Sequence, residues 1–274
     1  MTLDLNIEQY LARIGLSTKP VPTLENLQTL QRAHLLAIPF ENIDVQLGQR
    51  LTTDVGQAFE KIVVRGRGGW CYEQNGLFGW ALQELGFHVM RMAAGVMREE
   101  RGPEVDGNHL CLLVKFAETG QEYLVDVGFG GSMVHPLPLK TCTEVQAPYT
   151  VGIRQLEDGY WRFWEDAGSG QFSYDFRREP ASETQLEDRC RHLQTDPSSG
   201  FVLNLIAELR ETTAHKILRG RVFKVLSPNG PEETVIESAT QLIDVLASEF
   251  HLDVPAVADL WPRIVRRHEE VDHS

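Results

Sequence analysis

The hydrophobic pattern changes near residue 88, and this change constrains the fold more than any other feature of the sequence. Before it, apolar residues recur at spacings of three and four, as between Leu24 and Ile38, which predicts amphipathic helices. After it, short runs of Val, Leu, Phe, Tyr and Trp are separated by turn residues, which predicts strands. Beyond residue 200 the two patterns mix. We therefore expect an α+β protein with several parts.

The pattern predicts a helical bundle over residues 1–88, a small sheet or barrel over 89–200 and a mixed α/β unit over 201–274. Thr23 and Ser238 are expected to cap helices, and Pro255 to lie at a helix start. Strands are predicted near Val89–Met97, His109–Phe116, Tyr123–Phe129, Tyr149–Leu156, Tyr160–Trp164, Phe172–Phe176, Val202–Leu209, Arg221–Leu226 and Glu233–Ile236.

Charge and composition restrict the function classes. The formal net charge of −13 argues against a uniform nucleic-acid-binding surface and leaves a local basic patch open. The sequence has no run of eighteen apolar residues, so no membrane span is predicted. The four cysteines form no C-x-x-C pair, so neither a metal site nor a disulfide scaffold is expected. A cytoplasmic location, where thiols stay reduced, fits this cysteine usage. The cysteines are Cys71, Cys111, Cys142 and Cys190.

The segment Arg65–Asn75 contains three glycines and Cys71 directly before an amphipathic helix. Glycines this dense let the backbone turn sharply or approach another group closely. They leave Cys71 at the helix start, where unpaired N–H groups and the helix dipole favour an anion. We therefore expect a lowered thiol pKa and a nucleophilic Cys71.

A nucleophilic cysteine needs a base, and the base needs an orienting partner. His109 opens an apolar strand directly after the polar loop 104–108, and Asp126 interrupts another apolar strand. A turn centred in Thr119–Gly120 would put both side chains on one face. That register staggers them by four residues, roughly 13 Å, which is too far for a hydrogen bond. A different loop or a bulge would have to close the gap.

At this point the sequence resembles the arylamine N-acetyltransferase family. Separate motifs occur in the family's order and at close to its spacing, and the resemblance is good over about residues 7–205 and looser beyond. The matching stretches are Ile38–Asn42, Arg67–Cys71 with Glu73 and Asn75, His109, Val125–Gly130 and, more weakly, Leu193–Phe201.

The resemblance implies a helical bundle, a β-barrel and an α/β lid. It also implies a cysteine-protease-like catalytic triad of Cys71, His109 and Asp126, whose contact would resolve the stagger. The implied reaction moves an acetyl group from acetyl-coenzyme A to Cys71 and then to an arylamine, arylhydrazine or N-hydroxyarylamine. The N–H of Cys71, with a second donor near Gly107, would bind the oxyanion.

By the same resemblance, Phe40, Val96 and Phe129 would line the acceptor pocket, and Ser198 and Gly200 would lie near coenzyme A. Glu41, Arg13 and Arg67 are expected to form a supporting ion-pair network. No metal is implied. Cys111, two residues after His109, stands where the family would lead us to expect an aliphatic residue.

Two other readings of the sequence stay open. A Cys-His-Asp triad also serves cysteine hydrolases and amidases, in which water or a peptide amine takes the acyl group. The chain could also be a non-catalytic binding protein on the same scaffold. The sequence leaves open the acceptor, the acyl-chain preference and the oligomeric state, a homodimer included.

Overall fold

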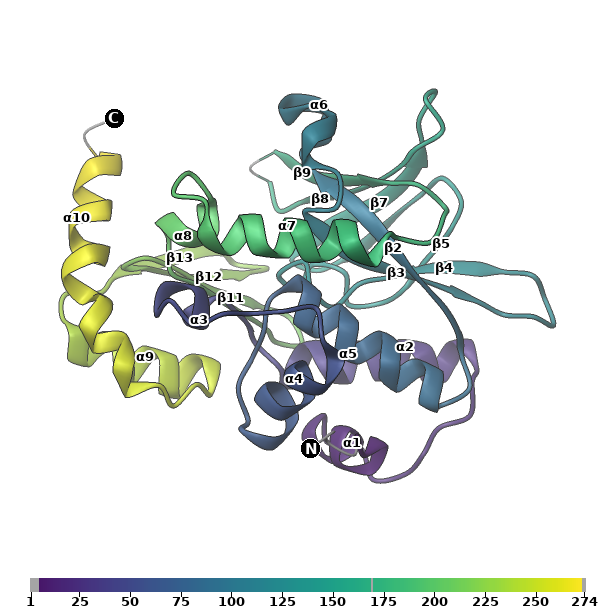
Figure 1. Ribbon diagram of the computed structural model, residues 1–274, viewed down its shortest axis with the longest axis horizontal. Coiled ribbons are helices and arrows are strands. Elements are labelled where there is room, and N and C mark those ends of the chain that lie inside the picture. Colours follow the sequence, from purple (N-terminus) through teal and green to yellow (C-terminus); the bar gives the residue numbers. More distant parts are fainter. Residues whose placement is uncertain (1–4, 169, 273–274) are drawn as a thin grey trace.

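Helices occupy most of the N-terminal part of the computed structural model, which describes residues 5–168 and 170–272 (Figure 1). The Thr23 hydroxyl accepts the Asn26 backbone N–H at 3.2 Å, which confirms the predicted cap of α2. The helix that starts at Cys71, α5, is buried along most of its length. The segments are α1 (Ile7–Arg13), α2 (Leu24–Ala37), α3 (Ile43–Gln46), α4 (Val55–Phe59), the π-helical η1 (Glu60–Val64) and α5 (Cys71–Glu84).

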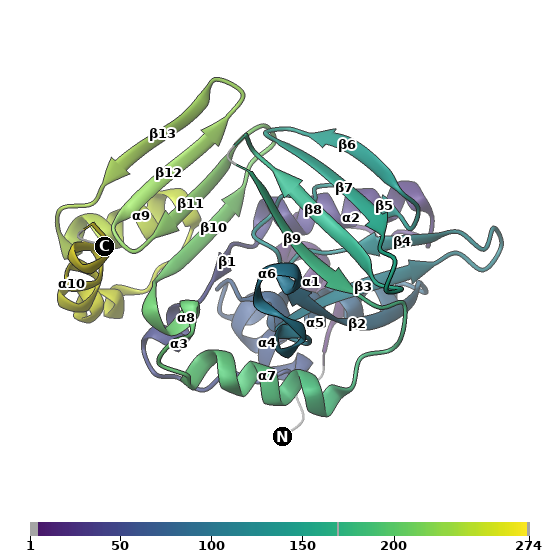
Figure 2. The same ribbon diagram turned by 90° about the horizontal axis from the view of Figure 1, so that it is seen from above.

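An antiparallel eight-stranded sheet follows and curves into a nearly closed barrel (Figure 2). Its strand order is β5-β4-β3-β2-β9-β8-β7-β6, so β2 bridges the two hairpin regions. Short helices, α6 (Arg98–Arg101) and η2 (Pro103–Val105), connect β2 to β3. The strands are β2 (His88–Val96), β3 (His109–Lys115), β4 (Glu122–Val125), β5 (Leu137–Pro138), β6 (Cys142–Gln146), β7 (Tyr149–Gln155), β8 (Trp161–Asp166) and β9 (Gln171–Phe176).

The β3–β4 hairpin has a different register from the one expected. Leu112 pairs with Val125, and the Phe116 N–H donates to the Gln121 carbonyl, so the turn centre lies one residue earlier. This change halves the stagger between His109 and Asp126 from four residues to two. Side chains on such a diagonal are within reach of one another.

A second antiparallel sheet has five strands, in the order β1-β10-β11-β12-β13. Its first strand comes from the helical part, because β1 (Phe40–Glu41) pairs with β10. The predicted strand over 202–209 is wrong in its first half, where α8 (Gly200–Leu203) ends only three residues before β10. The strands are β10 (Ile206–Arg210), β11 (His215–Arg219), β12 (Val222–Ser227) and β13 (Gly230–Val235).

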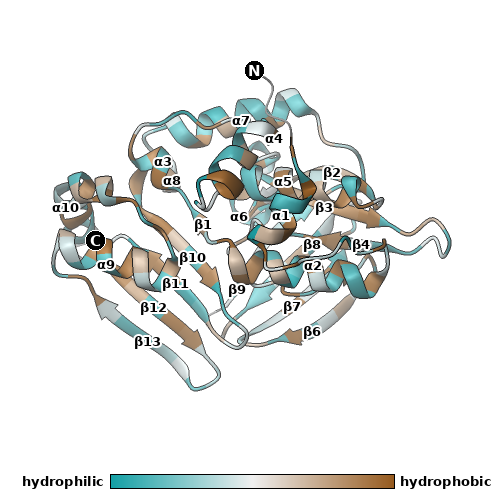
Figure 3. Cartoon of the chain, turned by 90° about the horizontal axis from the view of Figure 1, so that it is seen from below, coloured by the Kyte–Doolittle hydropathy of each residue, from teal (hydrophilic) through white to brown (hydrophobic). Residues whose placement is uncertain are grey.

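The sequence pattern missed α7 (Glu183–Thr195), which crosses the outside of the molecule from the barrel towards the five-stranded sheet (Figures 1 and 2). Figure 3 shows it as a largely hydrophilic helix, and only Leu186 and Cys190 are buried. Two buried positions in four turns give too weak an apolar stripe to be recognised from periodicity.

The C-terminal helices pack against the five-stranded sheet. The hydroxyl of Ser238 accepts the Gln241 N–H at 3.1 Å, which confirms the predicted cap. Pro255 begins a 3₁₀ helix that leads into the last α-helix. These elements are α9 (Ala239–Phe250), η3 (Pro255–Leu260) and α10 (Trp261–Asp272). Within the described residues, no helix is long and apolar enough to cross a membrane.

Candidate active site

The loop before α5 runs through a space that admits only glycine. A Cβ atom on Gly68 would lie 2.2 Å from the Pro39 carbonyl oxygen, and one on Gly69 would lie 2.9 Å from the Glu73 Cβ. Both distances are shorter than side chains tolerate. The predicted reason for the glycines, close approach of the backbone, is therefore confirmed, and the approach brings Cys71 to the first position of α5.

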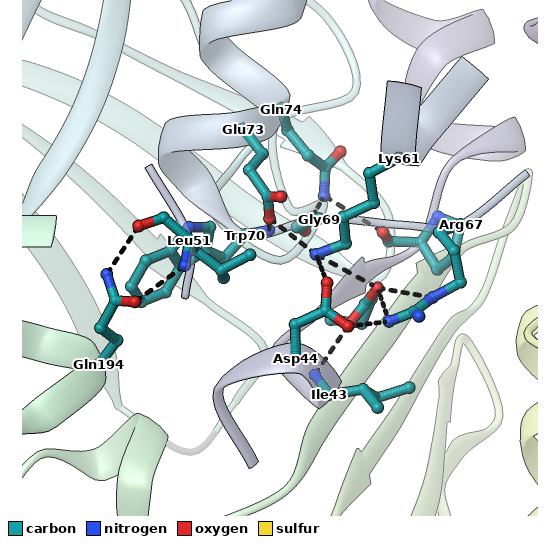
Figure 4. Close-up of polar contacts among 12 residues, drawn as sticks. Ile43, Asp44, Leu51, Lys61, Arg67, Gly69, Trp70, Glu73, Gln74 and Gln194 are labelled. Atoms are coloured by element: carbon teal, nitrogen blue, oxygen red, sulfur yellow. Dashed lines mark hydrogen bonds and ion pairs between the residues drawn. The ribbon is translucent and has the colours of Figure 1, made fainter. Parts of the chain in front are cut away.

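Buried charges lie beneath this loop (Figure 4). The Lys61 ammonium is 3.0 Å from carboxylate oxygens of both Asp44 and Glu73 and 3.6 Å from Glu41. The same Glu73 oxygen accepts the Trp70 N–H at 3.2 Å. The charges therefore hold the backbone at the residue that precedes Cys71.

The expected ion pair between Glu41 and Arg67 is present at 2.7 Å, and Arg67 also reaches Asp44. Arg13 does not take part as predicted. Its guanidinium donates instead to carbonyl oxygens, among them that of Ala37 at 2.8 Å and that of Ile62 at 3.0 Å. Lys61, whose role the sequence pattern did not reveal, is the central cation.

Cys71 is 3% exposed, and this burial raises the pKa of its thiol well above the ordinary value. The backbone N–H groups of Leu110 and Tyr72 hydrogen-bond the sulfur and oppose the rise. The prediction that the helix start by itself gives a low thiol pKa is therefore wrong, because desolvation outweighs the backbone donors. A neighbouring base is needed to make the thiolate.

His109 and Asp126 are in direct contact. The His109 Nε2 lies 2.6 Å from Asp126 Oδ2, and both side chains are buried. Because Leu110 both follows His109 and donates to the Cys71 sulfur, the start of β3 lies beside the thiol. The structure therefore brings all three predicted triad residues into one region.

Asn75 connects this pair to the cysteine helix. Its amide nitrogen donates to Asp126 Oδ1 at 2.8 Å and to the Leu110 carbonyl at 2.6 Å, and its oxygen accepts the Val127 N–H at 2.9 Å. Asp126 Oδ1 also accepts the Gly128 N–H. Asn75 was recognised only as part of a motif, yet its i+4 spacing from Cys71 puts both on one face of α5.

The predicted acceptor-pocket residues lie in different places. Phe129 packs on His109 with ring centroids 5.1 Å apart. Phe40 is buried in the cluster that contains Cys71. Val96 ends β2, packs against the barrel core and pairs with Tyr174.

The residues predicted near coenzyme A flank the start of α8. The Ser198 hydroxyl donates to Asp196, and Gly200 is the first residue of α8. The next residue, Phe201, packs on Trp70 at 5.4 Å, so this segment lies close to the Cys71 loop.

The expected oxyanion donor near Gly107 does not have a free amide. The Gly107 N–H donates to the Ala94 carbonyl and the Asn108 N–H to the Val105 carbonyl. The Gly107 carbonyl accepts the Tyr72 hydroxyl at 2.6 Å. These bonds fix the loop before His109 and leave the N–H of Cys71 as the predicted donor.

Cys111 lies in the barrel core, fully buried beside Met92 and Leu113. In the register of β3 and β4 it would stand opposite Asp126, one position past the Leu112–Val125 pair. Burial raises the pKa of this thiol as well. Among the described residues, no group of three or more His, Cys, Asp or Glu side chains could hold a metal ion.

A family model described as N-acetyltransferase matches residues 23–258. The chain is 36% identical over 265 residues to the arylamine N-acetyltransferase of Mycolicibacterium smegmatis, a match that covers 94% of this chain and 95% of that protein. It is 28% identical over 263 residues to the liver isozyme of Gallus gallus, covering 88% and 91%.

Solved structures of such enzymes superpose over nearly the whole chain. The arylamine N-acetyltransferase of M. smegmatis matches with a TM-score of 0.86 and 33% identity, covering 95% of this chain and 97% of that one. The Mycobacterium marinum enzyme in complex with CoA matches with a TM-score of 0.84 and 31% identity, covering 96% and 98%.

Proposed function

Because this chain belongs to the arylamine N-acetyltransferase family, we propose that it carries an acetyl group on Cys71 from acetyl-coenzyme A to an arylamine, arylhydrazine or N-hydroxyarylamine. Membership makes the chain an acetyltransferase enzyme. The observation that most supports the route through Cys71 is the bond between His109 and Asp126, which Asn75 ties to the helix that begins at Cys71.

The contacts of His109 assign its two nitrogens. An ionised carboxylate only accepts hydrogen bonds, so Nε2, which contacts Asp126, carries the proton of the neutral ring. Nδ1 is then the basic nitrogen and can accept the proton of the Cys71 thiol. Asp126 stabilises the imidazolium that forms, and the amides of Leu110 and Tyr72 stabilise the thiolate.

In the first half-reaction the Cys71 sulfur attacks the thioester carbonyl of acetyl-coenzyme A. The carbonyl oxygen becomes an oxyanion near the N–H of Cys71, an amide of the first helical turn that has no partner within the helix. When the intermediate collapses, the carbon–sulfur bond to coenzyme A breaks. The proton on His109 passes to the departing thiolate, and Cys71 holds the acetyl group.

In the second half-reaction the amine or hydrazine nitrogen attacks the acetyl-cysteine. His109 takes one proton from this nitrogen and returns it to the Cys71 sulfur as the amide leaves. The enzyme is then in its starting state, which makes the exchange a ping-pong reaction. Neither half-reaction requires a metal or a redox change.

The remaining assignments concern substrate contacts. Phe129 lies against His109, so an aromatic acceptor in contact with it would present its nitrogen to the acetyl-cysteine. We assign Phe40 and Val96 to the same pocket and Ser198 and Gly200 to coenzyme A. The unit over 201–274 would act as the lid. The homodimer stays a prediction that light scattering checks.

The test is the intact mass of the purified chain after incubation with acetyl-coenzyme A, alone and followed by a simple arylhydrazine. We expect one acetyl adduct on the wild type that the hydrazine discharges as acetylhydrazide. Cys71→Ala should give no adduct, whereas Cys190→Ala, which removes another buried thiol, should still give one.

Two results would count against this function. An adduct that persists in Cys71→Ala would move the nucleophile to another residue. No adduct on the wild type, with rapid alkylation of Cys71 at neutral pH, would mean that the nucleophile is right and the donor wrong. The cysteine hydrolase would then become the better explanation.

A further inference from the structure

Two acidic side chains approach the loop that follows the predicted catalytic aspartate. A Cβ atom built on Gly130 would lie 2.2 Å from Glu208 Oε2, so the Glu208 carboxylate of β10 lies against this loop. Glu165 of β8 approaches the same loop, since the Ser132 hydroxyl is close enough to interact with its carboxyl group. The loop Phe129–Ser132 therefore lies between carboxyl groups from both sheets.

Glu165 lies on the same face of the barrel sheet as the aromatic rings near His109. It pairs across strands with Phe172, and residues that pair directly share a face. Phe172 stacks on Phe129 with centroids 5.2 Å apart and an interplanar angle of 11°. Phe129 in turn packs on His109. A path of ring contacts, one stacked and one tilted, thus leads from Phe172 beside Glu165 to the predicted general base.

The opening of this aromatic cluster lies beside Glu165. Phe172 is 42% exposed, an unusual value for a ring stacked on a second ring, whereas Phe163 and Tyr174 deeper in the barrel are fully buried. A flat aromatic molecule that contacts Phe129 would extend outward along Phe172. Because Phe172 pairs directly with Glu165, the far end of such a molecule would lie on the strand face that carries Glu165.

Glu165 lacks the partners that a buried carboxyl group normally has. Across residues 5–168 and 170–272, neither Glu165 Oε2 nor Ser132 Oγ has a hydrogen bond of good geometry, although both atoms are buried. Burial, together with the negative charges of Glu208 and Asp126, raises the pKa of Glu165 to about 8. An unmade hydrogen bond at a buried acceptor is costly, so a ligand that supplies a donor is favoured.

Glu208 differs, because it has a partner of its own. Its carboxylate is 3.3 Å from His215 Nε2, and His215 Nδ1 lies 2.6 Å from the Tyr149 hydroxyl. The negative charge of Glu208 therefore acts on Glu165, although Glu208 itself is paired with His215. The titratable groups that interact with Glu165 are the carboxyl groups of Glu208 and Asp126 and the hydroxyls of Tyr149 and Tyr174. Arg210 and His215 lie against the same loop at Gly131.

We propose that Glu165 determines acceptor specificity by hydrogen-bonding a second amino group, placed para to the nitrogen that is acetylated. The inference rests on the proposed function and narrows its substrate class to arylamines and arylhydrazines with a donor or cationic para substituent. A para carboxylate would face the carboxyl groups of Glu165, Glu208 and Asp126 and is disfavoured by repulsion.

The test compares acceptors that differ in one para group: 4-(aminomethyl)aniline, its neutral isostere 4-ethylaniline and the anionic 4-aminobenzoate. The rate constant for discharge of the acetyl-enzyme is measured for wild type, Glu165→Gln and the control Glu157→Gln, which changes an exposed glutamate in the β7–β8 turn. We expect Glu165→Gln to lower the aminomethyl-to-ethyl ratio by about tenfold or more, since hydrogen bonds to charged groups are worth this much. The reaction of 4-aminobenzoate should become faster.

Acetylation of each variant by acetyl-coenzyme A is measured first. Equal rates show that Glu165→Gln is folded and that the proposed function holds. An unchanged ratio in an acetylated Glu165→Gln then overturns the specificity inference alone, whereas failure of the wild type to acetylate overturns the function itself.

The pH dependence of the aminomethyl-to-ethyl ratio distinguishes recognition by Glu165 from a purely structural role, because a structural role would not change this ratio with pH. Between about pH 7 and pH 8.5 the wild-type ratio should rise, because Glu165, with its pKa near 8, becomes charged. The ratio of Glu165→Gln should stay flat. Parallel profiles of the two proteins would contradict the proposal.

Discussion

Carboxyl groups with buried oxygen atoms occur in two regions near the predicted nucleophile, and their neighbours differ in charge. Behind the Cys71 loop, Glu73 accepts bonds from the Lys61 ammonium and the Trp70 N–H (Figure 4). At the barrel, the neighbours of Glu165 are hydroxyl groups, among them that of Ser132, and the carboxyl groups of Glu208 and Asp126. Burial raises the pKa of both carboxyl groups, but only the first has a cation that opposes the rise.

This difference in partners indicates that Glu73 has a structural role and that Glu165 is available to bind a ligand. Charged groups that pair with one another within the chain hold a backbone segment in place, and most of their hydrogen-bonding positions are occupied before any ligand binds. A carboxyl group whose oxygen has no partner destabilises the free protein slightly and gains a bond when a donor binds. We therefore assign positioning to the Lys61 network and recognition to Glu165.

The largest expected effect that tests the comparison of Glu73 with Glu165 is a loss of folding stability in a Lys61 variant. Lys61 is 2% exposed, and Lys61→Met leaves Asp44, Glu41 and Glu73 without their shared cation. The free energy of unfolding at pH 7 should fall by about 3–5 kcal/mol, as when one partner of a buried ion pair is removed. Urea denaturation measures this change.

The matched control is Lys224→Met, since Lys224 is partly exposed and pairs with the exposed Glu233 at 2.9 Å. Its loss should be below about 1 kcal/mol. If the two variants lose equal stability, the Lys61 network does not hold the loop and the comparison fails.

The next largest expected effect is on the reactivity of the Cys71 thiol. Burial raises the pKa of Cys71, so without a base the thiol stays protonated at neutral pH and ionises only in alkali. In His109→Gln, alkylation of Cys71 by iodoacetamide at pH 7 should be about a hundredfold slower, within the range typical of general-base loss. The rate should then rise with pH beyond pH 9.

The alkylation is followed by mass on the peptide that contains Cys71, because the partly exposed Cys142 also reacts. Gln185→Ala changes a half-buried polar residue of α7 and serves as the control, with a profile like that of the wild type. A wild-type rate at pH 7 in His109→Gln would mean that His109 does not take the thiol proton.

The smallest effect is on the stability of the barrel region. A glutamate with a raised folded-state pKa binds its proton more tightly when folded, so its contribution is lost as pH rises through about 8. Glu165→Gln cannot ionise and should be the more stable protein above that pH, by about 1 kcal/mol. Near pH 5, where Glu165 is protonated in the folded state, the difference should shrink.

Thermal unfolding at about pH 5 and about pH 9 measures this, with Glu157→Gln as the exposed control. Loss of stability in Glu165→Gln at pH 9 would show that the carboxylate has a partner after all, and would remove the contrast with Glu73.

Much of the arrangement could be predicted because local chemistry dictates it. Thr23 and Ser238 cap the helices that follow them, since a side-chain oxygen satisfies a backbone donor close in sequence. Most barrel strands begin and end within two residues of their predicted ends, because alternating apolar runs report burial on one face. The hydrophilic α7 was missed for the same reason, since its environment is mostly solvent.

The site could be predicted in its residues and not in its contacts. Cys71, His109 and Asp126 were recognisable as a cysteine behind glycines, a histidine at a strand start and a carboxylate in an apolar run. Their distances depend on the hairpin register, where a shift of one residue in the turn centre changed the stagger from four residues to two.

The sequence by itself determined most of the helices and strands, the motifs and the nucleophile's position at a helix start, since each depends on neighbours along the chain. The tertiary structure decided the electrostatics. That Lys61 contacts three carboxylates, and that Glu165 interacts with the carboxyl groups of Glu208 and Asp126, depends on segments far apart in sequence. Burial then raised the pKa of Cys71 above what the helix start alone would give, because desolvation is a property of the packed interior.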